Sequence, residues 1–231
     1  MNDILTSLSQ ALSLIAQGDP ELWGIILLSL QVSGLALGIT MVIGIPIGAV
    51  LGLRRVFGRG LITALLYTGM GLPPVVVGLA VYMLLSRSGP MGELHWLFTP
   101  SAMIFAQAII AFPLVAGLTM TAVRSVDPDL RLQARALGAT SIQEAWAVLR
   151  EARLGVVAAI VAAFGAVISE VGAVMLVGGN IAGKTRVLTT AIMLETRQGE
   201  FELALALGVI LLALSFAANL AMLPLQGRSR A

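Results

Sequence analysis

Five long runs of the chain contain almost no charged side chain, and this feature most restricts the possible fold. They cover residues 22–53, 60–86, 94–123, 154–183 and 203–227, and Glu170 is the one acidic residue within them. About 20 apolar residues in a helix cross the roughly 30 Å hydrocarbon core of a bilayer, so each run is long enough to span it. With 58% hydrophobic and 11% charged residues, the chain is too apolar for a water-soluble domain. The sequence therefore predicts an all-α membrane protein with about five transmembrane helices.

The first 20 residues have the pattern of a surface helix. Leu5, Leu8, Leu12 and Ile15 recur at helical spacing, which predicts a short amphipathic helix on the periplasmic side of the membrane. A sixth, tilted span is the alternative. Residues 21–227 are then a single transmembrane domain, and residues 228–231 are a cytoplasmic tail.

Positive charges give the predicted orientation, because Arg and Lys in short loops accumulate on the cytoplasmic side of a membrane. With the amino terminus outside and the carboxyl terminus inside, the inner segments hold ten of the 14 positive residues. The other four, on the outer side, are Arg87, Lys184, Arg186 and Arg197. Seven acidic residues accompany these four, so the outer surface is poorly suited to attract anions over a distance.

The first long run carries a row of glycines. They are Gly34, Gly38, Gly44, Gly48 and Gly52. Small residues let membrane helices approach closely, so the row predicts a helix-packing face.

The longest polar connection, residues 124–153, has the pattern of two short helices. Asp127 followed by Pro128 predicts an N-cap with proline at the first helical position. Apolar residues then recur three or four positions apart on both sides of Gly138, which can form the turn. Thr140 or Ser141 can cap the second helix. The sequence therefore predicts a cytoplasmic helix-turn-helix that projects from the membrane domain.

Residues 132–149 resemble the EAA loop of ABC importer permeases. The first eight residues read LQARALGA, and Ala134, Gly138 and Val148 match the family pattern E-A-A-x3-G-x9-I-x-L-P in register. The chain departs from this pattern at its first two positions, which are Leu132 and Gln133, and it lacks the final Leu-Pro pair. The second helix need not end as it does in better-known members.

In that family, a short helix of this loop lies in a groove of the ATPase subunit and carries nucleotide-driven motion to the membrane helices. A small residue at the turn permits close contact, and a rigid helix transmits displacement. A bulky charged residue in place of Gly138 is predicted to abolish transport and loosen the ATPase while the protein still inserts. Transport that survives with the ATPase bound would contradict this role. The resemblance implies a coupling function for Ala134, Arg135, Leu137, Gly138, Ala139, Ile142 and Trp146.

Two further stretches resemble the molybdate, sulfate and tungstate branch of these permeases. Residues 72–79 read LPPVVVGL, and residues 169–186 contain SEVGA and GNIAGKTR. The continuation over residues 187–204 is most similar to the tungstate group. The resemblance implies the type I ABC importer permease fold and a channel-forming subunit for a tetrahedral oxyanion. Tungstate is the first choice, with molybdate and sulfate as alternatives.

The resemblance also implies the partners and the location. Two copies of the chain pair around a central path in the inner membrane of a bacterium, among membrane lipids. Two ATPase subunits dock on the cytoplasmic loops, and a periplasmic or lipid-anchored binding protein delivers the anion. ATP and magnesium are bound by the ATPase, so no enzyme activity, cofactor, metal or nucleic acid is expected for this chain. Residues 178–185 satisfy the P-loop pattern G-x4-G-K-T, but they follow a predicted span instead of a strand and are not read as a nucleotide site.

Eight residues are predicted to shape the pore or its gate. Prolines within spans remove backbone hydrogen bonds and bend helices. Hydroxyl and amide groups can hold an oxyanion weakly enough to release it. The eight are Pro73, Pro74, Pro113, Ser169, Glu170, Asn180, Thr185 and Thr189.

Glu170 is the one acidic residue within a predicted span, and its carboxylate would repel a divalent anion. A structural role is therefore favoured, in which Glu170 pairs with a cation or with donors of the outer loop, such as Lys184 or Arg186, or is held protonated. A gating role is the alternative. A secondary transporter is the competing class, but it leaves the cytoplasmic helix pair unexplained, and Glu170 lies too near the outer end of its span to be a mid-membrane coupling acid.

Overall fold

The computed structural model describes residues 13, 20–54 and 56–227, with side chains described up to residue 220. This part of the chain is helical and contains no strand. The predicted amphipathic helix at the amino terminus and the tail 228–231 lie outside the described residues, apart from Ser13 and Pro20.

Three helices are long and apolar enough to cross a membrane by themselves. They are α2 (Pro20–Leu53), α5 (Pro100–Arg124) and α11 (Phe201–Gly227), of which residues 201–220 meet the test. Two bent helix pairs raise the number to as many as five if each pair is one span. The pairs are Arg59–Met70 with Pro74–Leu85, and Ser141–Glu151 with Arg153–Ile168. Within the described residues, this range agrees with the predicted five spans.

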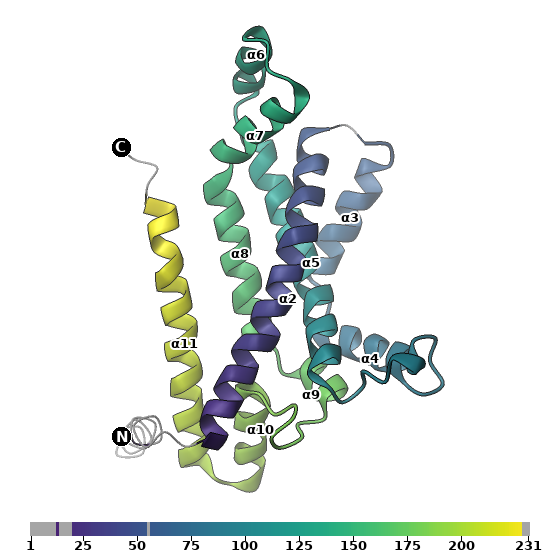
Figure 1. The fold of residues 1–231 in the computed structure, drawn as a ribbon, viewed down its shortest axis with the longest axis vertical. Coiled ribbons are helices and arrows are strands. Elements are labelled where there is room, and N and C mark those ends of the chain that lie inside the picture. Colours follow the sequence, from purple (N-terminus) through teal and green to yellow (C-terminus); the bar gives the residue numbers. More distant parts are fainter. Residues whose placement is uncertain (1–12, 14–19, 55, 228–231) are drawn as a thin grey trace.

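The predicted second span is broken at its prolines. Helix α3 (Arg59–Met70) ends before Gly71, and α4 (Pro74–Leu85) starts at Pro74 and runs at 102° to α3. Neither Pro73 nor Pro74 has an N–H with which to continue the ladder of α3. The predicted bend is therefore confirmed, and it amounts to a complete change of direction. In Figure 1, α4 points sideways from the bundle.

The prediction of one continuous fourth span over residues 154–183 is wrong. Helix α8 (Arg153–Ile168) stops at Ser169, and a separate short helix, α9 (Gly172–Gly178), follows. Helix α9 packs against α4 so closely that a Cβ on Gly78 would lie 2.5 Å from the Ala173 Cα. Helix α10 (Leu188–Gln198) then leads into α11. No proline marks this break, where the Glu170 carboxylate bonds to the start of α9 and α4 packs against α9.

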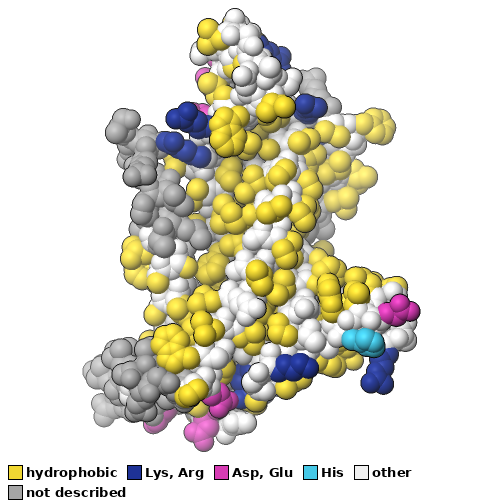
Figure 2. Space-filling model, in the orientation of Figure 1, with side chains coloured by type: hydrophobic (Ala, Val, Ile, Leu, Met, Phe, Trp, Pro, Cys, Tyr) yellow, Lys and Arg dark blue, Asp and Glu magenta, His cyan; other side chains and the backbone are white. Residues whose placement is uncertain are grey.

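Helix α2 lies at the centre of the bundle and contributes to five separate clusters of buried side chains. Val32 packs with residues of α4, α5 and α9. Leu22 and Ile26 pack with α10 and α11, and Leu37 packs with α5 and α8. Figure 2 shows apolar side chains over the middle of the molecule and charged ones gathered towards its two ends, as a bilayer requires.

The predicted glycine face is confirmed in one half of α2. A Cβ on Gly48 would overlap the Ala116 carbonyl oxygen, and one on Gly52 would lie 2.5 Å from Val123 Cγ1, so α2 and α5 approach closely there. Gly34 and Gly38 have no such neighbour within 4 Å. The packing face therefore starts at Gly44, and the prediction is wrong for the first two glycines.

Two short helices stand beyond the bundle at one end of the molecule. They are α6 (Pro128–Ala136) and α7 (Ser141–Glu151), at the top of Figure 1. The connection between α2 and α3 lies at the same end, while α9, α10 and the 3-10 turn η1 (Gly92–Leu94) lie towards the other. The segments predicted to face the cytoplasm thus share one end of the molecule.

Candidate functional site

Local capping fixes where the projecting helices begin. Asp127 caps α6, because its carboxylate accepts a hydrogen bond of 2.9 Å from the Asp129 N–H, and Pro128 takes the first helical position. Thr140 caps α7 through its hydroxyl, which accepts from the Gln143 N–H, while the Gln143 side chain accepts from the Thr140 N–H. The predicted helix-turn-helix is confirmed with both of its N-caps.

Gly138 forms the turn between α6 and α7. Its φ is +80°, in the left-handed region, where a side chain costs about 1–2 kcal/mol. A Cβ on Gly138 would meet no atom within 4 Å. Within this chain, glycine is therefore required by the backbone conformation and not by crowding, and the space beside it is open to a partner.

A carboxylate of α7 bonds to two arginines of α6. Arg131 Nε donates to Glu144 Oε1 at 2.6 Å, while Arg135 donates from Nε to Oε2 at 2.8 Å and from Nη2 to Oε1 at 3.1 Å. The Glu144 side chain is only 8% exposed. These bonds, led by the one from Arg135, lower the pKa of Glu144 to about 2. We call Glu144, Arg131 and Arg135 the Glu144 cluster.

The opposite side of the helix pair is apolar and exposed. Leu137 is 89% exposed, Ile142 82% and Trp146 70%, whereas Val148 is buried. Residues four apart share a helix face, so Ile142 and Trp146 mark the outer face of α7, and Glu144 and Val148 mark its inner face. We call the exposed set the outer patch, which consists of Leu132, Leu137, Ile142 and Trp146.

The seven predicted coupling residues lie together on this helix pair. Five of them, Arg135, Leu137, Gly138, Ile142 and Trp146, are exposed, while Ala134 and Ala139 are half-buried. Ile142 and Trp146 also line an open cavity of about 660 Å³ with Arg150 and Arg153. A large apolar surface with a basic edge, standing clear of the membrane domain, is suited to binding another protein.

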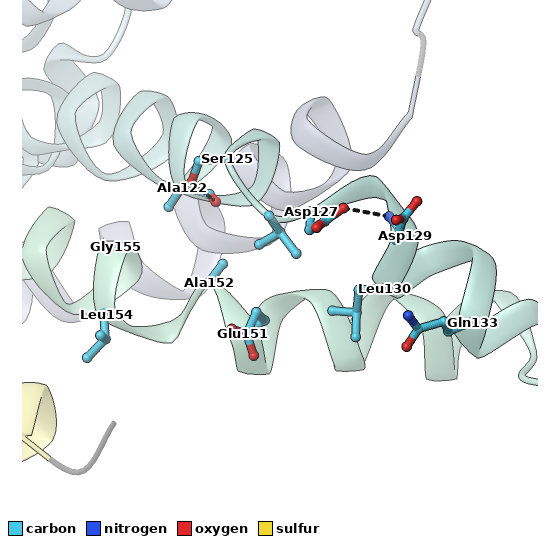
Figure 3. Close-up of a pocket in the computed structure, with 11 residues that line it drawn as sticks. Ala122, Ser125, Asp127, Asp129, Leu130, Gln133, Glu151, Ala152, Leu154 and Gly155 are labelled. Atoms are coloured by element: carbon cyan, nitrogen blue, oxygen red, sulfur yellow. Dashed lines mark hydrogen bonds between the residues drawn. The ribbon is translucent and has the colours of Figure 1, made fainter. Parts of the chain in front are cut away.

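A second cavity, of about 530 Å³, lies at the base of the helix pair. Figure 3 shows that its lining comes from the end of α5, from α6 and from the junction of α7 and α8. Asp127, Asp129 and Glu151 contribute its acidic groups. At the base of α6, only Val126 and Leu130 pack against the bundle, and the cavity takes up the rest of the space.

The two helix breaks meet at a third cavity, of about 370 Å³. Four of the predicted pore residues line it: Pro73, Pro74, Pro113 and Glu170. Pro113 lies within α5, next to Gly69, where a Cβ would lie 2.7 Å from the proline ring. The structure thus brings the prolines of two predicted spans to one hollow together with the intramembrane acid.

Glu170 is 8% exposed, and its carboxylate accepts a hydrogen bond of 2.9 Å from the Ala173 N–H at the start of α9. The predicted pairing with Lys184 or Arg186 is wrong: among the described ion pairs Glu170 has none, and Arg186 pairs with Glu21 at 3.4 Å. Glu170 precedes a new helix, so backbone donors are close by and replace the distant cations. The broader prediction of a structural role agrees with this contact.

The other four predicted pore residues do not line this cavity. Ser169 is exposed and bonds to the Gly165 carbonyl, and the Thr189 hydroxyl donates to the Glu170 carbonyl at 2.9 Å. Thr185 is fully buried: its hydroxyl donates to the Gly178 carbonyl at 2.6 Å and accepts from the Ile181 N–H at 2.9 Å. Asn180 has a φ of +51°, and its buried Oδ1 has no partner among the described residues.

The turn chemistry of residues 178–185 also explains the P-loop match. These residues connect α9 to α10, and the threonine hydroxyl holds the loop together from inside. A P-loop follows a strand and leaves its threonine free for a metal ion, so the match carries no nucleotide site.

Glu144 and Arg131, the partners that join Arg135 in the cluster, are not among the residues predicted from the sequence. One signal was present: Arg131 and Arg135 are four residues apart on the first helix, and Glu144 is the one acidic residue in the first turn of the second. Across a tight turn, such groups face each other.

The family model for the binding-protein-dependent transport system inner membrane component matches residues 44–230. A probable anion ABC transporter permease protein of Haloferax volcanii is 49% identical over 196 residues, covering 83% of this chain and 84% of the relative. The tungstate uptake system permease protein TupB of Peptoclostridium acidaminophilum is 40% identical over 226 residues, covering 98% of this chain and 99% of the relative. The molybdenum transport system permease protein ModB of Escherichia coli K12 is 32% identical over 192 residues, covering 79% and 83%.

Solved structures share the fold. A chain of a bacterial ABC transporter involved in import of the acidic polysaccharide alginate gives a TM-score of 0.74 at 20% identity, covering 91% of this chain and 80% of that chain. A chain of the MetNI methionine ABC transporter gives 0.68 at 18% identity, covering 88% and 95%. The predicted ABC importer permease fold is confirmed. The chain belongs to the family of binding-protein-dependent transport system inner membrane components, as a multi-pass helical protein of the membrane.

Proposed function

We propose that the chain is the channel-forming permease subunit of an ATP-driven importer for a tetrahedral oxyanion, with tungstate as the substrate. Two copies of the chain enclose the path, a cytoplasmic ATPase subunit docks on each helix pair α6–α7, and an external binding protein supplies the anion. The amino terminus is outside the cell and the carboxyl terminus is inside. ATP and magnesium are bound by the ATPase and not by this chain.

The observation that carries the proposal is the exposed apolar side of the helix pair α6–α7. Leu137, Ile142 and Trp146 are each at least 70% exposed, and their helix pair lies at one end of the molecule, outside its apolar middle. Burial of three large apolar side chains in a groove of a partner would supply several kcal/mol of binding free energy. The EAA-like sequence of the same residues supports an ABC ATPase as that partner.

Tungstate is supported by a relative that is similar over nearly the full length of both chains. TupB of Peptoclostridium acidaminophilum, a tungstate uptake permease, matches 98% of this chain at 40% identity. The molybdenum permease ModB is similar at 32% over 79%, so molybdate remains compatible with the same fold. We assign the choice among tetrahedral anions chiefly to the cavity of the binding protein.

We place the anion path beside the cavity at the two helix breaks. Pro73, Pro74 and Pro113 shape this cavity, and Glu170 holds the start of α9 at its edge. Thr189 fixes the backbone of Glu170 from α10. Asn180 Oδ1 is buried without a partner among the described residues, while the hydroxyls of Ser169 and Thr185 already donate to the Gly165 and Gly178 carbonyls.

Reconstitution in liposomes tests the proposal. The chain is purified with its ATPase, and uptake of tungstate is measured with the binding protein and ATP. We expect uptake only when the ATPase and ATP are present, and we expect Trp146→Ala to weaken capture of the ATPase by about tenfold or more. Trp23→Ala is the matched control, because Trp23 is also exposed but lies at the other end of the molecule.

Two results would contradict the proposal. The first is tungstate uptake by the chain alone, driven by an ion gradient. The second is ATPase capture that is equally strong with Trp146→Ala and with Trp23→Ala. Uptake of molybdate but not tungstate would keep the class of transporter and correct the substrate.

A further inference from the structure

Helix α6 has no buried residue, which is unusual for a helix that must transmit force. All nine of its residues, 128–136, are exposed or half-buried. Beneath it lies the cavity of about 530 Å³ between α6 and the junction of α7 and α8. Leu130 is the one residue of α6 that packs on the buried cluster of Val123 and Val148, so apolar packing holds α6 on α7 at a single point.

The Glu144 cluster provides a second connection between the two helices. Three charged hydrogen bonds of 2.6, 2.8 and 3.1 Å join the two helices through one carboxylate, and Arg135 uses two nitrogens in a fork that fixes its angle as well as its distance. The carboxylate is nearly covered although its helix is exposed. Charge-assisted bonds to a covered acceptor are stronger and more directional than those of an exposed surface pair.

The position of Glu144 on α7 adds a second argument. Glu144 and Val148 share the inner face of the helix, and Val148 belongs to a buried cluster with Ala49 of α2 and Val123 of α5. The carboxylate thus links α6 to the face of α7 that contacts the membrane helices, while Ile142 and Trp146 face outward. Displacement of α6 passes to the bundle through this face.

We infer that Glu144 is a positioning residue for energy coupling, which holds α6 rigidly on α7 so that movement of a docked ATPase reaches the membrane helices. The inference rests on the proposed function, because it presumes that the helix pair docks on the ATPase. Without the cluster, α6 moves independently of α7. The ATPase then continues to bind the outer patch and hydrolyse ATP, but less of that energy moves the anion.

The experiment measures two rates in the same liposomes that contain the permease, the ATPase and the binding protein. These are the rate of ATP hydrolysis and the rate of tungstate uptake, and their ratio reports coupling. With Glu144→Gln, which keeps the volume of the side chain, we expect uptake per ATP to fall about fivefold or more while the complex still assembles and hydrolyses ATP. Glu144→Asp, which keeps the charge on a shorter stem, should recover part of the ratio.

Glu151→Gln is the matched control, since Glu151 is an exposed carboxylate of the same helix. An unchanged ratio with Glu144→Gln would overturn the inference, and so would equal losses with Glu144→Gln and Glu151→Gln. If the yield of the complex and the rate of ATP hydrolysis both fall, the inference is also overturned, because that pattern indicates a folding role alone. Failure of the proposed function is distinguishable, because Trp146→Ala would then leave ATPase capture unchanged.

Discussion

Glu144 lies between Arg131 and Arg135, and hydrogen bonds from Arg135 and then Arg131 lower its pKa from 4.5 to about 2. A carboxyl group whose pKa is lower in the folded state stabilises that state above its unfolded pKa. The contribution of the Glu144 cluster is therefore complete above about pH 4.5 and is lost as the pH falls from there through about 2. We expect the helix pair α6–α7 to loosen over this range.

Hydrogen exchange of the amides of residues 128–151, corrected for the intrinsic pH dependence of exchange, measures this loosening. Glu144→Gln should show low protection at every pH, with no step between pH 4.5 and pH 2. The amides of α5, which carries no acidic residue, serve as the internal reference. A step of equal size in the Glu144→Gln variant would assign the effect to other carboxyl groups, such as Asp127 or Asp129.

Two acidic residues show how far the roles and partners of single side chains could be predicted from the sequence. The sequence identified Glu170 as structural, because an acid within an apolar run needs partners. It did not identify the correct partner, since the Ala173 N–H becomes available only where α8 stops. Glu144 lies in a polar loop where acids are ordinary, and only the folded turn places it within reach of Arg131 and Arg135.

At the scale of helices, elements with local signals were predicted well. Asp127, Pro128, Gly138 and Thr140 fix both helices of the projecting pair through neighbours three or fewer residues away. The prolines at 73 and 74 likewise mark the break between α3 and α4. The break after α8 has a weaker local signal, the Glu170 carboxylate that accepts from the Ala173 N–H, and contacts with α4 and α10 also stabilise it.

The contact of α2 with α5 yields a prediction for helix packing. Gly48→Leu would drive a side chain into the Ala116 carbonyl and the Thr119 Cβ, so we expect it to destabilise the protein by about 1–3 kcal/mol or more. Gly34→Leu is the control on the same helix, where a Cβ meets no atom within 4 Å. Thermal unfolding of the detergent-solubilised protein compares the two. Equal midpoints would show that the two helices are not tightly packed at Gly48.

At the scale of the whole molecule, the positive charges predict which end faces the cell interior. The chain has no cysteine, so single cysteines can be introduced without a background signal. Ala136→Cys on α6 and Ala182→Cys between α9 and α10 replace exposed alanines near opposite ends. In intact cells, we expect a membrane-impermeant maleimide to label position 182 and not position 136. The reverse pattern would show that the orientation is inverted and that a cytoplasmic ATPase cannot dock on α6–α7.

The general architecture could be predicted because composition and charge act over whole spans. The uncharged runs locate α2, α5 and α11, because each of these helices is long and apolar enough to cross a bilayer by itself. The arrangement of α4, α9 and α10 could not be predicted, since each is too short to cross a bilayer and is placed only by its neighbours.

The interrupted helices also restrict how hydrocarbon can surround the protein. Where α3 ends, Pro74 offers no N–H to the Met70 carbonyl, and lipid tails contain no donor that could replace it. That flank must therefore face water or polypeptide. Annular lipids should therefore surround the chain as an incomplete ring, open on the side of the α3–α4 break.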